Sequence, residues 1–148
     1  MIRNPRSIGA GFALLALLAL HTPADAAQVN IPASIFHKQI SAPDVIWYSG
    51  VSSSNFSGST LSMIAPLPRV PGAGGVTVFV DGYGVSGGPY NCTVYSSSGA
   101  SKSFSRNTAL SWTASVNFTS VEISSSSYLS LTCSVPPDGA FKGITVVG

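Results

Sequence analysis

Short runs rich in hydrophobic residues, many of them alternating with polar ones, recur along the chain and are separated by turn-forming residues. Val76 to Val80 (VTVFV) is the strongest of them, because it consists of β-branched and aromatic side chains. Such runs are typical of β-strands, whereas an amphipathic helix needs apolar residues at i, i+3, i+4 and i+7. No convincing window of that helical kind follows residue 26. The pattern therefore predicts an all-β protein.

Eight or so strands are expected, at a spacing of about 8–12 residues that is typical of an antiparallel sandwich or barrel. We expect a single antiparallel β-sandwich, formed as one domain by residues 27–148. Turns are expected at Ser98-Gly99 and Pro136–Gly139, and Ala65–Gly75, with its three prolines and three glycines, should be a loop or a sheet-edge crossover. The expected strands are Val45–Ser49, Thr60–Ile64, Val76–Val80, Cys92–Ser96, Lys102–Arg106, Leu110–Phe118, Val121–Ser124, Leu129–Val135 and Gly143–Val147.

The first 26 residues have the features of a secretory signal peptide. Arg3 and Arg6 precede an uncharged apolar run from Ile8 to Leu20, and Ala24-Asp25-Ala26 supplies a small–x–small cleavage pattern. The apolar run is shorter than the roughly 20 residues that a membrane-spanning helix needs. We therefore expect cleavage before Ala27, no membrane span in the mature chain, and a secreted or periplasmic location.

The chain contains two cysteines, Cys92 and Cys133, so only one intramolecular pair can form. Export would place them in an oxidising compartment, where a disulfide is expected, while two buried thiols or an intermolecular bridge stay open as alternatives. With Trp112 between them, they follow the order found in immunoglobulin domains. Leu131 stands where those domains carry a tyrosine two residues before the second cysteine, so we reject the immunoglobulin assignment.

Charge is scarce: 8% of the residues are charged, against roughly 25% in ordinary globular chains, and the formal net charge is +2. Such a chain has no basic surface for nucleic acid and no polybasic segment for a membrane. Its hydrophobic content of 45% is enough to fill a core, which argues against disorder. The solvent-facing sides of the strands are expected to carry Ser and Thr in place of Lys and Glu.

Two motifs of cofactor-binding or catalytic sites overlap between Gly82 and Gly88, and we reject both. Gly82–Gly87 fits G-x-G-x-x-G and Gly84–Gly88 fits G-x-S-x-G, but each motif needs a helix to follow. Here Pro89 and a predicted strand follow instead. We expect a glycine-rich turn, in which Asp81-Gly82 is a typical turn pair.

Groups that could perform catalysis are few. After the leader, the chain has one histidine, His37, and four carboxylates. A pair formed by Asp81 with Asp44, Glu122 or Asp138 would supply the number of acids that a glycosidase needs, but turn formation explains these residues better. We therefore expect a protein that is not an enzyme, with no catalytic residues, no metal site and no cofactor. His37 should be exposed or lie at a sheet edge.

Aromatic side chains are the best candidates for a binding function, because the apolar faces of sugars stack on Trp and Tyr rings. In a domain of this size most aromatic residues must fill the core, and Phe79, Trp112 and Phe118 are expected there. Tyr83 and Tyr90 flank the glycine-rich segment and are the expected exposed pair, which makes them the candidate ligand-binding residues. Three N-glycosylation sequons begin at Asn55, Asn91 and Asn117.

The stretch from Leu129 to Gly139 (LSLTCSVPPDG), followed by Gly143 to Val146 (GITV), resembles the C-terminal part of small exported bacterial β proteins of unknown function. In those proteins a second cysteine also precedes a Pro-Pro turn and a last strand. The resemblance covers the chain from Cys92 onward and implies a small disulfide-bonded β domain with no known activity. Chaperone–usher pilus subunits are also exported and disulfide-bonded, but their disulfide typically lies near the mature N-terminus.

Two functions fit these features. The main hypothesis is a non-enzymatic structural component of a surface or matrix that assembles with copies of itself. In that case Ala27–Ile40 would add a strand to a neighbouring sheet, although pairing within its own sandwich is the alternative. The second function is binding of glycans or a cell surface through Tyr83 and Tyr90.

Overall fold

The computed structural model describes residues 27–38, 46–49, 52–68, 74–84, 88–107, 110–124 and 126–148. The expected signal peptide, residues 1–26, lies outside the described residues, as does Asp44. Within the described part of the chain, no helix is long and apolar enough to cross a membrane.

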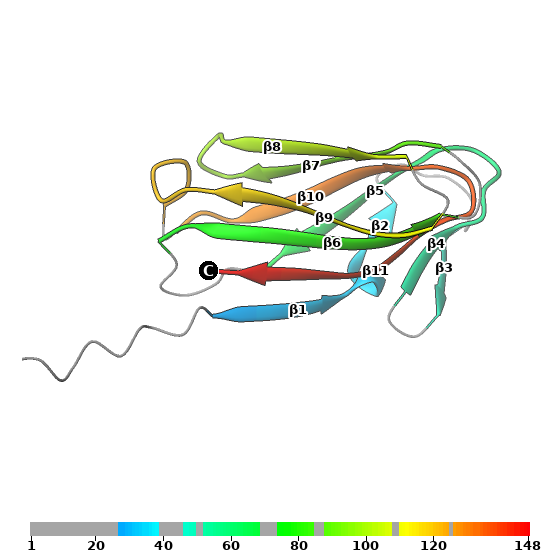
Figure 1. Ribbon diagram of the computed structural model, residues 1–148, viewed down its shortest axis with the longest axis horizontal. Helices are drawn as coiled ribbons and strands as arrows, with labels where there is room; N and C mark the ends of the chain where they lie inside the picture. Colours follow the sequence, from blue (N-terminus) through cyan, green and yellow to red (C-terminus); the bar gives the residue numbers. More distant parts are fainter. Residues whose placement is uncertain are drawn as a thin grey trace, which may run out of the picture.

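The strands form two antiparallel sheets packed as a sandwich, as the sequence pattern predicted (Figure 1). We call them sheet A and sheet B. Sheet A has the order β3-β4-β11-β6-β9, with β1 also paired to β11, and sheet B has the order β2-β5-β10-β7-β8. Sheet A contains β1 (Gln28–Pro32), β3 (Ile46–Ser49), β4 (Ser52–Asn55), β6 (Val76–Gly84), β9 (Ser111–Phe118) and β11 (Gly139–Val147). Sheet B contains β2 (His37–Lys38), β5 (Leu61–Leu67), β7 (Tyr90–Ser96), β8 (Ser101–Arg106) and β10 (Leu129–Val135).

The eight strands from β4 to β11 are divided between the sheets in the jelly-roll manner. Their orders, 4-11-6-9 and 5-10-7-8, follow from two interlocked Greek keys. A single 3₁₀ turn, Ala33–Ile35, carries the chain from β1 on sheet A to β2 on sheet B. The first and last described strands lie side by side, and the Gly148 N–H donates to the carbonyl of Ala27 at 2.9 Å.

Along most strands, inward and outward side chains alternate, and the inward side chains fill the space between the sheets. In β9, Trp112, Ala114, Val116 and Phe118 are buried, while every residue between them is exposed. Part of the core is an aromatic cluster, in which the ring of Phe36 is stacked on that of Phe141 with 4.3 Å between the ring centroids. Tyr90 and Trp112 complete it, at 4.8 Å from each other.

The disulfide between Cys92 and Cys133 is confirmed. The two cysteines lie directly opposite each other in neighbouring strands, β7 and β10, with their Cα atoms 4.1 Å apart. Both are buried, so the bridge lies on the core side of sheet B. An immunoglobulin disulfide joins the two sheets, whereas this one fixes the register within a single sheet.

Two parts of the strand assignment from sequence are wrong. Ala65–Leu67, assigned to the Pro- and Gly-rich loop, continues β5, because Pro66 is exposed and lies on the outer face. Val121–Ser124 forms a turn, because Glu122 is held back against Thr119: its N–H donates to the Thr119 carbonyl and its carboxylate accepts the Thr119 N–H. β4 has no large apolar residue and was not assigned.

Of the two expected Asp-Gly turns, the structure contains one. Asp138-Gly139 does form a turn, with Asp138 at φ +57° and the Gly139 N–H donating to Pro136 at 3.0 Å. Asp81-Gly82 does not, because β6 runs on through Gly84. The remaining part of the glycine-rich segment, residues 85–87, lies outside the described residues.

The N-terminal segment is part of its own sandwich. β1 pairs with β11 from Gln28 opposite Val147 to Pro32 opposite Gly143, and β2 pairs with β5. Phe36, fully buried, anchors the connection between them in the aromatic cluster. Residues 39 and 40, at the end of the segment proposed for strand exchange, lie outside the described residues.

Candidate functional site

The outer face of sheet A carries a groove of about 320 Å³ where β6, β9 and β11 run side by side. Gly143, paired with Asp81, presents no side chain there, and polar side chains stand around it. The lining residues are Asp81, Gly82, Ser111, Trp112, Thr113, Lys142 and Gly143.

Gly82 and Trp112, which both line the groove, share one place in the sheet. They are directly opposite each other in the β6–β9 pair, and the indole lies against the Gly82 backbone. A Cβ atom at residue 82 would come within 2.1 Å of Trp112 Cζ2. The missing side chain therefore lets a large buried ring lie directly beneath the groove, as an aromatic residue covering a strand glycine does elsewhere.

The polar groups of the groove are held in place by one another. Thr113 Oγ1 donates to Asp81 Oδ1 at 2.5 Å across the β6–β9 pair. Lys142 Nζ donates to Ser111 Oγ at 2.7 Å, spanning from β11 to the start of β9. Lys142 stands at an irregularity of the β6–β11 pairing, between Phe141 and Gly143, and this shift leaves its side chain exposed on the outer face.

Tyr83, one of the two candidate ligand-binding residues, is exposed at the end of this groove. Its side chain keeps 38% of its accessible surface, and its ring lies 5.5 Å from Lys142 Nζ. Tyr83 is on the same face of β6 as Asp81, because side chains two residues apart on a strand share a face. The sequence therefore identified this residue correctly as an exposed aromatic ring beside the glycines.

Tyr90, the other candidate, is fully buried, so its expected exposure is wrong. Its hydroxyl donates to the carbonyl of Tyr83 at 2.6 Å and accepts the N–H of Ala140 at 3.0 Å. Burial raises the pKa of this phenol above its usual value of 10.0. Tyr90 has a structural role: its hydroxyl links β7 to the ends of β6 and β11 beside the groove. Because its ring is buried, it cannot stack on a ligand.

Phe79 was assigned to the core, and that assignment is wrong as well. It lies on the outer face of β6, partly exposed, opposite Ser115 and Thr145. The alternation along the strand could have shown this. The inward positions are Val76, Val78 and Val80, so Phe79 falls on the outer face. Asp81 and Tyr83 share that face. Trp112 and Phe118 are buried as expected.

Phe79 and Tyr83 thus stand on either side of Asp81, along one strand. Four residues of β-strand separate the two aromatic positions by about 13 Å. Between them lie a carboxylate, an ammonium group and two hydroxyls that can donate or accept hydrogen bonds. Such a set can hold a ligand that has apolar faces and many hydroxyl groups.

In the described part of the chain, the other titratable groups do not gather into a site. His37 is exposed on the short strand β2, as expected. Among the described residues, no three His, Cys, Asp or Glu side chains are placed so that they could hold a metal ion. Glu122 is engaged by Lys102 at 2.5 Å at the end of the sandwich, and Asp138 occupies the Pro136–Gly139 turn.

The three sequons differ in exposure. Asn55 is fully buried and serves as a structural clamp, with its amide donating to the carbonyls of Ser59, Val135 and Pro136. Asn91 and Asn117 are exposed on the outer faces of sheet B and sheet A.

The sequence matches no protein-family model and no curated protein. The fold, in contrast, is similar to that of solved carbohydrate-binding modules. The C-terminal CBM6 of a marine laminarinase from Zobellia galactanivorans aligns with TM-score 0.55 and 13% identity, over 82% of this chain and 100% of that chain. A family 35 carbohydrate-binding module from Clostridium thermocellum aligns with TM-score 0.55 and 11% identity, over 82% and 98%.

A third module, from a Cellvibrio mixtus lichenase and solved in complex with cellotriose, has TM-score 0.54 and 9% identity, over 81% of this chain and 96% of that chain. At such low identity the similarity establishes a shared β-sandwich fold.

Proposed function

We propose that this protein is an exported, non-catalytic carbohydrate-binding module that holds a saccharide in the groove on sheet A. The observation that carries the proposal is the exposed Tyr83 ring beside a groove lined by Asp81, Thr113, Ser111 and Lys142. The similarity of the fold to carbohydrate-binding modules supports the same proposal.

The physical argument rests on the two surfaces of a sugar ring. Its axial C–H faces are apolar and pack on an aromatic ring, while its equatorial hydroxyls need hydrogen-bond partners. Tyr83 supplies the first contact, with Phe79 as a second ring farther along β6. Asp81 accepts, Lys142 donates, and the hydroxyls of Ser111 and Thr113 can do either.

The polar side chains of the groove are held in place without a ligand. The hydrogen bonds Thr113–Asp81 and Lys142–Ser111 restrict four side chains that would otherwise lose rotamer freedom on binding. All of the lining residues belong to strands of one sheet, so the positions of the polar atoms follow from strand register. A binding role needs such preorganisation and needs no nucleophile–base pair, which fits the scarcity of catalytic groups.

Export is supported by the disulfide, because such bonds persist in oxidising compartments. Cleavage before Ala27 stays a prediction. Self-assembly, the main hypothesis from sequence, receives no support from a particular contact. β1 is already paired with β11, and giving it to a neighbour would first require breaking that pairing.

The direct test is affinity electrophoresis through gels that contain laminarin, mixed-linkage β-glucan, xylan, galactomannan or β-galactan. We expect wild-type protein to be retarded by at least one of these polysaccharides. Tyr83→Ala should weaken that retardation by about tenfold, which corresponds to about 1.4 kcal/mol. Asp81→Asn tests the polar side of the groove and should weaken it too.

Phe56→Ala is the matched control, because Phe56 is an exposed aromatic residue outside the groove, 58% accessible. Its retardation should equal that of wild type. Retardation of Tyr83→Ala equal to that of wild type would remove the groove from the proposal.

A further inference from the structure

The outer face of sheet B is a second surface with a distinct chemistry. On this face, the outward positions of three of its strands, β10, β7 and β8, that are in register with one another across the sheet carry uncharged side chains. One row contains Ser101, Tyr95 and Ser130, and the next contains Ser103, Thr93 and Thr132. These nine outward residues are Asn91, Thr93, Tyr95, Ser101, Ser103, Ser105, Ser130, Thr132 and Ser134.

Two tyrosines stand at one end of this face with their rings in solvent. Tyr95 is 49% accessible and Tyr128 is 75% accessible. Tyr95 lies opposite Ser130 on β10, and Tyr128 precedes Ser130 by two residues. Tyr128 is therefore diagonally across from Tyr95, and such diagonal neighbours have backbone positions about 7–8 Å apart in a sheet.

Tyr128 is not a loose loop residue, because its backbone is fixed on both sides. Its N–H donates to Ser97 Oγ at 3.0 Å, and its carbonyl accepts the Ser97 N–H at 2.9 Å. One backbone hydrogen bond and one bond to a side-chain hydroxyl therefore hold Tyr128 against Ser97, two residues after Tyr95 in the chain.

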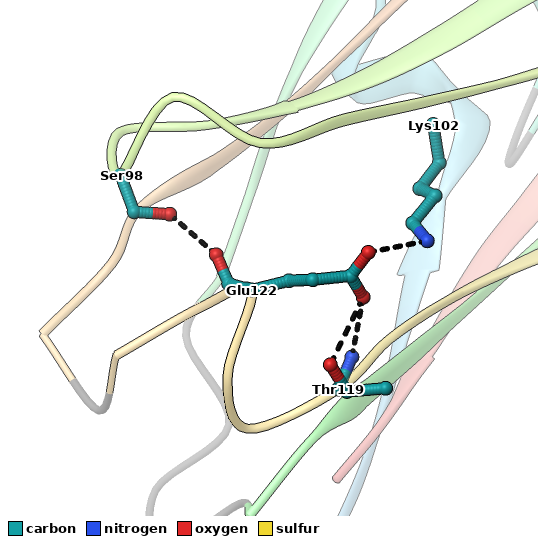
Figure 2. A network of polar contacts seen from close by, with 4 residues as sticks. All are labelled: Ser98, Lys102, Thr119 and Glu122. Atoms are coloured by element: carbon teal, nitrogen blue, oxygen red, sulfur yellow. Dashed lines mark hydrogen bonds and ion pairs between the residues drawn. The ribbon is translucent and has the colours of Figure 1, made fainter.

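The loop that leads to Tyr128 is held by Glu122 (Figure 2). The Glu122 carboxylate contacts Lys102 Nζ at 2.5 Å and accepts the N–H and hydroxyl of Thr119, at 2.8 and 3.1 Å. The Ser98 hydroxyl donates to the Glu122 carbonyl at 2.8 Å, which ties the loop to the β7–β8 hairpin. The hairpin, the loop and the edge strand β8 therefore form one connected unit around the two rings.

The middle of the face is rigid too. Directly beneath it, the Cys92–Cys133 disulfide joins β7 to β10. On the face itself, Thr93 Oγ1 and Ser103 Oγ are hydrogen-bonded at 2.8 Å. These nine uncharged outward residues, held in fixed register with two exposed tyrosines at one end, are more than a solvated strand surface requires.

We propose that the outer face of sheet B is a second saccharide-binding surface, for a neutral polysaccharide chain that stacks on Tyr95 and Tyr128. The proposal rests on the proposed function and deepens it, because it makes the protein bivalent. Tyr83 and Tyr95 are the penultimate residues of consecutive strands, β6 and β7, which end at opposite ends of the sandwich (Figure 1). The two surfaces therefore face away from each other and cannot bind the same short oligosaccharide.

The lack of charge on the nine outward residues favours a neutral ligand. An acidic polysaccharide or a charged protein surface would lose hydration on this face and gain no ion pair, because none of the nine outward residues is charged. A neutral polysaccharide has hydroxyls that match the Ser and Thr hydroxyls and apolar ring faces that match the tyrosines.

The test uses an ¹⁵N-labelled full mature chain titrated with each of five soluble oligosaccharides, derived from the polysaccharides in the electrophoresis panel. We expect two separate groups of shifted amide signals, one in β6, β9 and β11 and the other in β7, β8 and β10. The stoichiometry should be two oligosaccharides per chain. In electrophoresis, the double variant Tyr95→Ala/Tyr128→Ala should weaken retardation by at least about tenfold.

Two controls address folding and location. Val121→Ala removes an exposed apolar side chain from the same loop, 95% accessible, and should leave binding unchanged. Tyr95→Phe/Tyr128→Phe keeps both rings and should retain most of the binding, which distinguishes stacking from the loss of a hydroxyl.

The outcomes separate the two proposals. Shifts confined to β6, β9 and β11, with a stoichiometry of one, would overturn the second surface and leave the groove in place. Shifts confined to β7, β8 and β10 would support the second surface and overturn the groove. Absence of shifts and of retardation with all five saccharides would overturn both.

Discussion

Gly82 and Trp112 occupy one position of the sheet between them: they are paired across β6 and β9, and the indole fills the space that a side chain of residue 82 would take on the core side. Trp112 therefore belongs both to the lining of the groove and to the aromatic cluster. Trp112 also contacts Tyr90 and Phe141, so a shift of the indole would be transmitted to the core.

We expect Gly82→Ala to destabilise the protein by roughly 1–3 kcal/mol or more, because the added methyl group forces a well-packed ring to move. The free energy of unfolding, measured by urea denaturation, checks this. Gly74→Ala is the matched control, since a Cβ atom there meets nothing within 4 Å. A Gly82→Ala protein as stable as Gly74→Ala would contradict the account of the groove.

Tyr90→Phe isolates the contribution of a single buried hydroxyl. The substitution leaves the ring in the cluster but deprives the Ala140 N–H of its acceptor and the Tyr83 carbonyl of a donor. We expect a loss of about 1–3 kcal/mol in the free energy of unfolding, the usual cost of buried polar groups without partners. Tyr95→Phe, at an exposed tyrosine, should change it by less than about 0.5 kcal/mol.

Acid should loosen the loop between β9 and β10 before it unfolds the sandwich. Hydrogen bonding to Lys102 and to the Thr119 N–H lowers the pKa of Glu122 below its ordinary value of 4.5. The carboxylate therefore stabilises the folded loop above that ordinary value, and this contribution is lost as the pH falls through the lowered pKa. The protection of the Thr119 amide from hydrogen exchange, taken relative to the intrinsic exchange rate at each pH, should decrease over that range.

Glu122→Gln is the comparison for this experiment, because it cannot titrate. The variant should show less protection at Thr119 at neutral pH, and no further loss of protection as the pH falls below the ordinary carboxyl value of 4.5. Identical pH profiles for the variant and wild type would show that Glu122 does not control the loop.

The disulfide should contribute mainly through the unfolded chain. It closes a loop with a sequence separation of 41, for which the chain-entropy relation gives about 4 kcal/mol. We expect Cys92→Ala/Cys133→Ala to lower the free energy of unfolding by roughly 2–4 kcal/mol while the far-ultraviolet circular dichroism stays that of a β protein. A loss of β structure at neutral pH without denaturant would instead show that the disulfide is required for folding.

Local pattern was enough for the class of the fold and for the pairing of the cysteines. Alternation in runs such as Leu129–Val135 reports which side chains face a core, and that strand was predicted with its observed bounds. The two cysteines could pair only with each other. Strands without large apolar residues, such as Ser52–Asn55, carry no such signal, because their inward positions are filled by Ser53 and Asn55, which are buried by hydrogen bonding.

At the candidate site, local sequence pattern is not enough to predict which side chains are exposed. Tyr83 and Tyr90 look alike in sequence, each near glycines and each next to a predicted strand. Strand phase alone places Tyr83 outward with Asp81, and it would have placed Phe79 there too. The burial of Tyr90 depends on Trp112 and Phe141, which reach it from the opposite sheet.

The sequence by itself determined that this chain is a lightly charged, disulfide-bonded β-sandwich with Ser and Thr on its surfaces, because these properties follow from composition and from a period of two. Only the tertiary structure decided which side chains meet across strands far apart in the chain. Thr113 meets Asp81, Lys142 meets Ser111, and Tyr128 meets Ser97, because strand order and register are set by the packing of both sheets together.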